Sequence, residues 1–390
     1  FAPLVLWTLT QVARKPGEVR WNMAGIVVLA GLILSHNAIS IMFLPVMLLY
    51  SGYLYYFETK RNSSFFISVL GILLGGFGIA AFFWIPAFFE GKYTLRDIVT
   101  AGEFAGRFVP WQWFFVSPWN WGGGNQFTKE IGLVQWIGVV YAVFVMLSRR
   151  ERVSRWLPMG LFGLFVLTLF LMTSWSGVVW NTVTILQKFQ FPWRLLSVSV
   201  FCAAALGGYA VHEIKKPLLV VALAIVLLLS QTRGMWKAQS YVVRPDSYYT
   251  GIYPGTTDTG ESSPIWSIRF MEHAPKAHLE GITGVAKIEE QRRTSAVHTY
   301  MVQTAKRTRF VENTLYFPGW HSAVDGIEVP VEFQDPAYRG LMTFWVDSGI
   351  HTVTVRFEET KLRKTANTIS MLSFAALLLT GTIRLWKKRT

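Results

Sequence analysis

Several charged side chains lie between residues 89 and 127, directly after a long apolar stretch. The candidates for chemistry among them are Glu90, Arg96, Asp97, Glu103 and Arg107. Carboxylates act as general bases or bind a divalent cation such as Mg²⁺ or Mn²⁺, and an arginine guanidinium holds phosphate with paired hydrogen bonds. Because functional residues concentrate on loops, we expect this segment to line an active or binding cleft.

Four tryptophans occupy the second half of the same segment. They are Trp111, Trp113, Trp119 and Trp121. Flat aromatic rings offer apolar faces on which a sugar or a prenyl chain packs, so Trp111 and Trp113 join the candidate cleft residues. A belt of tryptophans at a membrane–water interface has the same appearance, and by themselves these residues favour that simpler interpretation.

A further candidate is the segment FPWRLL, residues 191–196. Pro192 suits the first turn of a helix, and the free N–H groups at a helix start bind anions. Arginine is unfavourable there by dipole arguments, so a bound anion would explain Arg194. The alternative is an interfacial arginine that extends to lipid headgroups.

Two polar residues, His36 and Asn37, interrupt an apolar run that extends from residue 22 to residue 57. As one helix this run would be about 54 Å long, whereas a bilayer core is about 30 Å thick. Two short spans with a break at His36 and Asn37 fit better. These residues either line the cleft or satisfy the backbone groups that the break leaves free.

The composition indicates a membrane protein with some soluble mass. Of the 390 residues, 52% are hydrophobic and 15% are charged, whereas an average globular chain has about 25% charged residues. Apolar runs of roughly 20 residues cross a bilayer as helices. We expect a partial span at 1–13, two spans within 22–57, and further spans at 64–90, 132–148, 156–174, 193–212, 217–231 and 367–385.

The basic residues set the expected orientation. The net charge is +14, but many Lys and Arg side chains lie in short loops between apolar runs, which is the positive-inside pattern and not a nucleic-acid-binding surface. With 22–57 counted as two spans, the loop 91–131 and the turn 187–192 face the exterior of the cell (inner) membrane. The basic segments on the cytoplasmic side are then 14–20, 58–61, 149–155, 213–216 and the C-terminus.

Apolar runs stop after residue 231, and short alternating segments with PG, DG and SG turns replace them. This pattern indicates a β-rich soluble domain. The segment HTVTVRF (351–357) has the pattern of a strand, and Asp325-Gly326 that of a hairpin turn. We predict a helical membrane region over 1–231, an exterior β domain over 232–366, and a last membrane helix with a basic tail over 367–390.

Several other chemistries find no support in the sequence. The single cysteine, Cys202, excludes a disulfide within the chain, and the histidines lack metal-ligand spacing, so no metal site is assigned to them. No P-loop, Rossmann, HExxH or GxSxG motif occurs. The apolar spans carry polar residues only near their exterior ends, which argues against a transporter.

A resemblance to a known family rests on five segments in order. The chain resembles bacterial multi-pass proteins of the GT-C glycosyltransferase superfamily, and within it the 6-pyruvoyl-tetrahydropterin-synthase-related membrane proteins, with the YfhO-like proteins as neighbours. The resemblance covers essentially the whole chain and departs from the family pattern at Ser262, where an aromatic residue is common. The segments are SHN (35–37), FPWRLL (191–196), GTTDTGESSP (255–264), YFPGWHSAVDG (316–326) and GIHTVTVRFEET (349–360).

The resemblance implies a GT-C-like multi-pass helical protein, with a β-sandwich-like domain before its last membrane helix and an exterior cleft. It implies transfer of a sugar from a polyprenyl-phosphate donor to a cell-envelope glycan or protein acceptor. In such enzymes an acidic residue of the first exterior loop commonly serves as base or metal ligand. We expect that loop to precede Phe1, so no residue here is assigned as the catalytic base.

On this interpretation Arg194, with Arg96 or Arg107, binds the donor phosphate. The sugar or a divalent ion is oriented by His36, Asn37, Glu90, Asp97 and Glu103. The alternative is a non-catalytic membrane protein that binds glycans or partners through its exterior β domain.

Overall fold

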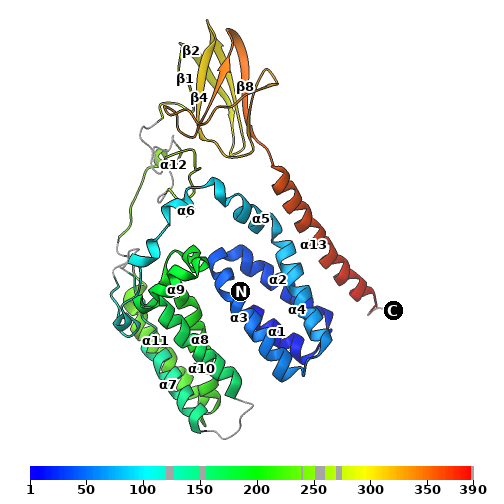
Figure 1. Ribbon diagram of the computed structural model, residues 1–390, viewed down its shortest axis with the longest axis vertical. Coiled ribbons are helices and arrows are strands. Elements are labelled where there is room, and N and C mark those ends of the chain that lie inside the picture. The colour runs from blue at the N-terminus through cyan, green and yellow to red at the C-terminus, as the bar shows by residue number, and fades with distance from the viewer. Residues whose placement is uncertain (120–126, 149–154, 239, 251–259, 269–274, 388–390) are drawn as a thin grey trace. The chain divides into compact units, whose positions relative to one another are not determined.

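The computed structural model describes residues 1–119, 127–148, 155–238, 240–250, 260–268 and 275–387. Its chain divides into two compact units, whose elements are labelled in Figure 1. Unit 1 comprises Phe1–Phe77, Ala101–Val242 and Thr380–Thr390, and unit 2 comprises Gly78–Thr100 and Val243–Leu379. Trp121 and the first half of the GTTDTGESSP segment lie outside the described residues.

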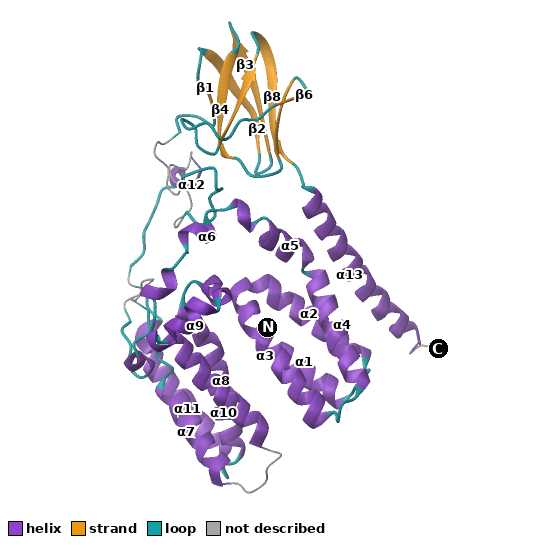
Figure 2. Cartoon of the chain, in the orientation of Figure 1, coloured by secondary structure: helices purple, strands orange, loops and turns teal. Residues whose placement is uncertain are grey.

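Unit 1 is built of helices (Figure 2), several of which are apolar. In its first part α1 packs against α2 and α3, and in its second part α10 packs against both α7 and α8. A π-helical turn, Leu54–Glu58, extends α3, and a 3-10 turn, Pro192–Leu195, begins α10. The helices are α1 (Ala2–Arg14), α2 (Val19–Ser35), α3 (Asn37–Tyr53), α4 (Ser63–Ile79, which continues into unit 2), α7 (Leu133–Ser148), α8 (Trp156–Met172), α9 (Gly177–Thr182), α10 (Leu196–His212) and α11 (Pro217–Thr232).

Unit 2 contains the remaining helices and all the described strands. The helices are α5 (Ala81–Phe89), α6 (Arg96–Val99), α12 (Ser247–Thr250) and α13 (Lys361–Lys387, which continues into unit 1 from Thr380). The strands are β1 (Leu279–Gly281), β2 (Ala286–Arg293), β3 (Val297–Thr304), β4 (Thr308–Leu315), β5 (Trp320–Val324), β6 (Ile327–Val329), β7 (Leu341–Val346) and β8 (Gly349–Phe357).

Four helical segments of the described chain are long and apolar enough to cross a membrane, or six if each of two bent pairs counts as one span. The bent pairs are α4 with α5, at 73°, and α8 with Ser174–Thr182, at 87°. The prediction of several helices of membrane-spanning length is confirmed in this sense. The four segments are Asn37–Glu58, Pro192–His212, Pro217–Met235 and Lys361–Ile383.

The chain breaks between α2 and α3 at His36, as the SHN segment predicts. His36 Nδ1 accepts a hydrogen bond from the N–H of Ile39 at 3.3 Å, and Asn37 Oδ1 accepts one from the N–H of Ala38 at 2.7 Å. Both side chains therefore satisfy donors that the start of a helix leaves free. Capping explains the hydrogen bonds that these side chains make.

The strands of unit 2 form two antiparallel sheets that share one core. One sheet has the order β1-β4-β7 and the other β2-β3-β8-β5-β6. Along β3, Tyr300 and Val302 are buried whereas Met301 between them is exposed, as expected for a strand with one face on a core. The other fully buried core residues come from both sheets and are Leu279, Phe310, Met342, Phe344, Val346, Val353 and Val355.

Two local predictions for this domain are confirmed. The segment HTVTVRF lies within β8. Asp325 and Gly326 join β5 to β6 with φ values of +50° and +81°, which are the positive values that a two-residue type I′ hairpin turn needs at both positions.

Candidate functional site

Val109 and Phe114 of the loop 91–131 contact one end of the bundle formed by α7, α8 and α10. The α8 helix runs opposite to α7 and α10, so its last residues lie at the same end as the first residues of the other two (Figure 1). The N–H of Val109 donates a hydrogen bond to the carbonyl of Met172, the last residue of α8, at 2.8 Å. The indole N–H of Trp136 in α7 donates to the carbonyl of Phe114 at 3.0 Å.

A buried tryptophan anchors the charged part of this loop. Trp180 of α9 is inaccessible to solvent, and its indole N–H donates to the carbonyl of Leu171 at 2.8 Å. The ring of Phe104 stacks on Trp180 with 5.5 Å between centroids, and the ring of Phe108 meets it edge-on at 6.2 Å. These contacts hold the turn that carries Glu103 and Arg107.

Gln190 links Glu103 to Arg194. The Gln190 amide nitrogen, Nε2, donates to Glu103 Oε2 at 3.0 Å. The Nη2 of Arg194 donates to the amide oxygen of the same Gln190 at 3.2 Å. The buried amide therefore bridges a carboxylate and a guanidinium that come from different segments of the chain.

The backbone of Gln190 is strained. Its φ is +63° and its ψ is −48°, and the N–H of Phe191 donates to the carbonyl of Phe189 at 2.6 Å across it. This is a γ-turn with a positive central φ, a rare conformation that a residue with a side chain adopts at a cost. Such strain tends to persist at functional sites.

Arg107 and Arg194 share an aromatic partner. Their guanidinium carbons lie 5.4 Å and 4.9 Å from the ring centroid of Phe191, within the range of cation–π attraction. The ring of Trp193 stacks on Phe191 with 5.1 Å between centroids, and the ring of Phe127 packs edge-on against Trp193 at 4.5 Å.

Lys129 adds a third positive charge to this group. Only 1% of its surface is exposed, and its Nζ donates to the carbonyl of Phe127 at 2.9 Å. The Nζ also lies 4.0 Å from the ring centroid of Phe127 and 5.3 Å from that of Trp113. Desolvation by burial lowers the pKa of Lys129, and the positive charge of Arg107 lowers it further.

We call Arg107, Lys129 and Arg194 the cation cluster. Glu103 is the carboxylate that Gln190 ties to it, so the charges of these four side chains sum to an excess of two positive charges. Three cations held among aromatic rings in a partly desolvated position attract an anion more strongly than exposed cations do. Binding an anion such as a phosphate is therefore the chemistry that the cluster suits best.

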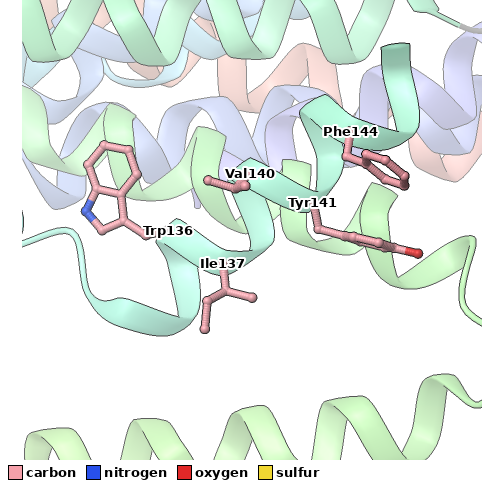
Figure 3. A pocket seen from close by; sticks show the side chains of 5 residues that line it. All are labelled: Trp136, Ile137, Val140, Tyr141 and Phe144. Carbon is pink, nitrogen blue, oxygen red and sulfur yellow. The ribbon is translucent and has the colours of Figure 1, made fainter. Parts of the chain in front are cut away.

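A shallow, open apolar groove lies along one face of α7 beside this end of the bundle. The ring of Trp136 stacks on Phe115 with 4.7 Å between centroids, and Phe115 follows the turn that contains Trp113. From Trp136 the groove runs to Phe144, over about 12 Å of helix, with a volume of 520 Å³. Figure 3 shows the side chains that line it, which are Trp136, Ile137, Val140, Tyr141 and Phe144.

Three predicted site residues lie in unit 2: Glu90 and Asp97, predicted to line the cleft, and Arg96, predicted to bind the donor phosphate. Glu90 is buried at the end of α5 and is held by Arg363 of α13. Arg96 and Asp97 are adjacent in α6, are both largely exposed and form an ion pair of 3.3 Å with each other. The contacts of the cation cluster described above involve none of these three residues.

The other predicted residues lie in unit 1. Trp113 contacts Lys129, and the half-exposed Trp111 meets Phe115 edge-on at 6.4 Å between centroids. Within the described residues no hydrogen bond joins His36 or Asn37 to the cation cluster. The structure thus brings together Glu103, Arg107, Trp113 and Arg194 among the predicted residues.

Sequence reasoning missed Lys129 and Gln190. Lys129 follows the glycine-rich stretch, where a lysine has the appearance of a solvated loop residue. Gln190 lies in an FQF tripeptide without a motif of its own. The signal that points to both is their position, since Gln190 lies between Phe189 and Phe191 and Lys129 lies two residues after Phe127.

Nothing in the described part of the chain forms a metal centre, since no three His, Cys, Asp or Glu side chains gather closely enough to hold an ion. Comparison with known proteins gives no further guide: no family model, no curated protein and no solved structure matches the chain.

Proposed function

We propose that the protein is a membrane glycosyltransferase of the GT-C type, which transfers a sugar from a polyprenyl-phosphate donor to a cell-envelope acceptor. The observation that carries this proposal is the cation cluster, in which Arg107, Lys129 and Arg194 gather at one end of a bundle of apolar helices. A lipid-linked phosphate needs this combination, because its anion lies at the headgroup level while its tail lies in the apolar layer.

Each part of the donor has a counterpart at this end of the bundle. The phosphate binds the cation cluster, with Arg194 as a principal ligand. When the sugar is transferred, negative charge develops on the phosphate as it leaves, and the three cations stabilise that charge. The prenyl tail lies in the groove along α7, where Trp136 begins an apolar surface.

The distribution of basic loops supports an orientation with the cation cluster on the exterior face of the cell membrane. The β-sandwich lies on the same face in this orientation, where it is available to a glycan or protein acceptor. Recognition of the acceptor is then the role that we propose for the sandwich.

The proposal is tested with the full-length protein in nanodiscs and a panel of radiolabelled polyprenyl-phosphate sugars, with and without EDTA. We expect protein-dependent consumption of one donor, reduced about a hundredfold or more in Arg194→Ala. The matched control is Arg20→Ala, since Arg20, like Arg194, lies over an aromatic ring, that of Trp21 at 5.0 Å. Its polar partner is Glu18.

Two results would contradict the proposal. One is equal turnover in Arg194→Ala and the parent protein, which removes the phosphate role from the cluster. The other is a panel in which no donor is bound or consumed. Glycan binding by a protein without transferase activity would then be the better interpretation, with the sandwich as the binding module.

A further inference from the structure

The first turns of α13 pack beside α5 in unit 2. The carboxylate of Glu90, which follows the last residue of α5, is held by Arg363 at 2.7 Å. Near the start of α5 the N–H of Phe82 donates to the hydroxyl of Ser370 at 2.8 Å. The two helices therefore run antiparallel over about 10 Å, and α5 covers one face of α13.

The other face of α13 is exposed and changes in character along the helix. Lys361 and Lys364 are exposed in its first turn, and further along Met371 and Leu372 are 64% and 66% exposed. Residues seven or eight positions apart share a face of a helix, so Met371 and Leu372 lie on the face of Lys364. A basic end thus continues directly into an apolar stripe.

The spacing of these residues fits the headgroup layer of a membrane. Lys361–Ile383 is long and apolar enough to cross a bilayer, and the exposed apolar residues of α13 begin at Ile369, about 7.5 Å of helix after Lys364. A headgroup layer is about 5–7 Å thick. Side chains of a helix point toward its N-terminus, so the lysine ammonium groups extend away from the apolar layer and among the headgroups.

Aromatic side chains lie at the same level on α5. Phe88 and Phe89 are 71% and 51% exposed and directly precede Glu90, the residue that ties α5 to α13. Lys92 follows, also exposed, with its ammonium group 5.1 Å from the ring centroid of Tyr93. Exposed apolar rings beside lysines are typical of a segment that lies at a membrane surface.

We call Lys92, Lys361 and Lys364 the lysine collar. Within the described residues the ammonium groups of the collar form no ion pair and donate no hydrogen bond. The neighbouring pairs Arg363–Glu90 and Arg356–Glu358 are each neutral. Glu359 is the exposed acid that stands against the collar, so three positive charges and one negative charge leave an excess of two positive charges.

We propose that the lysine collar, together with Phe88 and Phe89, binds the headgroups of anionic lipids. A surface with excess positive charge at headgroup depth prefers an anionic lipid to a zwitterionic one, and each lysine adds to that preference. In the orientation proposed above this end of α13 is exterior, where the positive-inside rule does not account for lysines. The site requires that α13 spans the membrane, and it does not depend on glycosyl transfer.

The test measures lipid preference beside the collar in the full-length protein in nanodiscs. In a Cys202→Ala background, Met371→Cys carries a fluorophore below Lys364. Its quenching by phosphatidylglycerol and by phosphatidylcholine, each with a nitroxide on the acyl chain, gives the local preference between the two lipids. We expect the parent to prefer phosphatidylglycerol and Lys361→Gln/Lys364→Gln to lower that preference about fivefold or more. Added salt lowers the preference of the parent.

The matched control is Lys276→Gln/Lys306→Gln, which makes the same change of charge at exposed lysines of the sandwich. We expect it to keep the preference of the parent, and we expect both double variants to melt within about 2 °C of the parent in phosphatidylcholine. Equal quenching by the two lipids in the parent would overturn the proposed site. A preference that survives in Lys361→Gln/Lys364→Gln, or that falls equally in the control, would also overturn it.

A depth measurement tests the level of the site without reference to lipid charge. Phe88→Cys and Ile327→Cys, each in the Cys202→Ala background, carry a spin label whose accessibility to oxygen and to a polar relaxation agent reports its depth. We expect headgroup depth at position 88 and bulk water at position 327, in the β5–β6 hairpin. Bulk water at position 88 would overturn the site. Donor turnover enters neither measurement, so failure of the proposed transfer leaves both results interpretable.

Discussion

Arg363 holds the carboxylate of Glu90 with two hydrogen bonds to one oxygen. Its Nε and Nη2 donate to Glu90 Oε2 at 2.8 Å and 2.7 Å, and the hydroxyl of Thr360 donates to Oε1 at 3.0 Å. The guanidinium also lies 4.7 Å from the ring centroid of Phe357, the last residue of β8. The pair therefore joins α5, the start of α13 and the end of the sandwich within unit 2.

Removal of one member of this pair is expected to destabilise unit 2. Arg363→Met keeps an unbranched apolar side chain but leaves Glu90 buried without its cation, which typically costs about 3–5 kcal/mol. The control is Arg356→Met, because the ion pair of Arg356 with Glu358 is exposed and such pairs contribute about 0–1 kcal/mol. Thermal unfolding followed by circular dichroism compares the two. Equal losses would show that Glu90 is not held as described.

The sandwich core predicts a second stability difference. Phe344 is buried between the sheets, whereas Ile327 at the hairpin is 74% exposed. Phe344→Ala should lower the free energy of unfolding by about 3–5 kcal/mol through lost burial and a cavity. Ile327→Ala should change it by no more than about 0.5 kcal/mol. Denaturant unfolding measures both, and similar values for the two variants would contradict a common core between the sheets.

The stability of the β5–β6 hairpin should depend on pH. His351 Nδ1 lies 2.7 Å from Asp325 Oδ2, and the hydrogen bond to Asp325 raises the pKa of His351 above its ordinary value of 6.5. The folded state therefore binds the proton more tightly, so the stabilisation is fully present below pH 6.5 and is lost as pH rises through the raised pKa.

Melting temperatures of the parent and of His351→Gln, measured across this pH range, check whether the stabilisation by His351 is lost as the pH rises. We expect the parent to lose stability relative to the variant as the pH rises past neutrality. The hydrogen bond with His351 lowers the pKa of Asp325. The stability that Asp325 contributes is therefore present above pH 3.8 and is lost as the pH falls through the lowered pKa. A parent–variant difference that grows with rising pH would refute the assignment.

Lys129→Met should stabilise the ligand-free protein and weaken anion binding. Desolvation and Arg107 lower the pKa of Lys129, so its protonated form is less favourable in the folded than in the unfolded chain. Below the lowered pKa the charge of Lys129 opposes folding. Stability therefore rises as the pH increases from this lowered pKa toward the pKa that Lys129 has in the unfolded chain. The melting temperature of the ligand-free protein tests the expected stabilisation. The affinity for inorganic phosphate tests the expected loss of anion binding. A variant that loses both stability and affinity would indicate a structural role only.

Local sequence signals predicted much of the fold. The helix break at His36 follows from a polar pair in a run too long for one span, and the hairpin at Asp325-Gly326 follows from the backbone angles that this dipeptide adopts. Both depend on residues close together in the chain. The division of the loop 91–131 between two units had no such signal, because it depends on contacts with distant segments.

The candidate site was predictable only in part for the same reason. Arg194 was recognisable because proline marks the start of its helix, and Glu103 and Arg107 because they are charged residues in a loop. Glu90 had the same appearance, but its partner Arg363 is 273 residues away, and no local pattern reveals that pair. Gln190 acts through a backbone conformation that the sequence FQF does not indicate.

The central claim is that the cation cluster binds the phosphate of a lipid. The most direct measurement is the affinity of the full-length protein in nanodiscs for a short polyprenyl phosphate, compared among the parent, Arg107→Ala, Lys129→Met, Arg194→Ala and the control Arg20→Ala. We predict losses of about tenfold or more for each cluster variant, and parent-like affinity for the control. Parent-like affinity in all three cluster variants, or no binding by the parent, would contradict the claim.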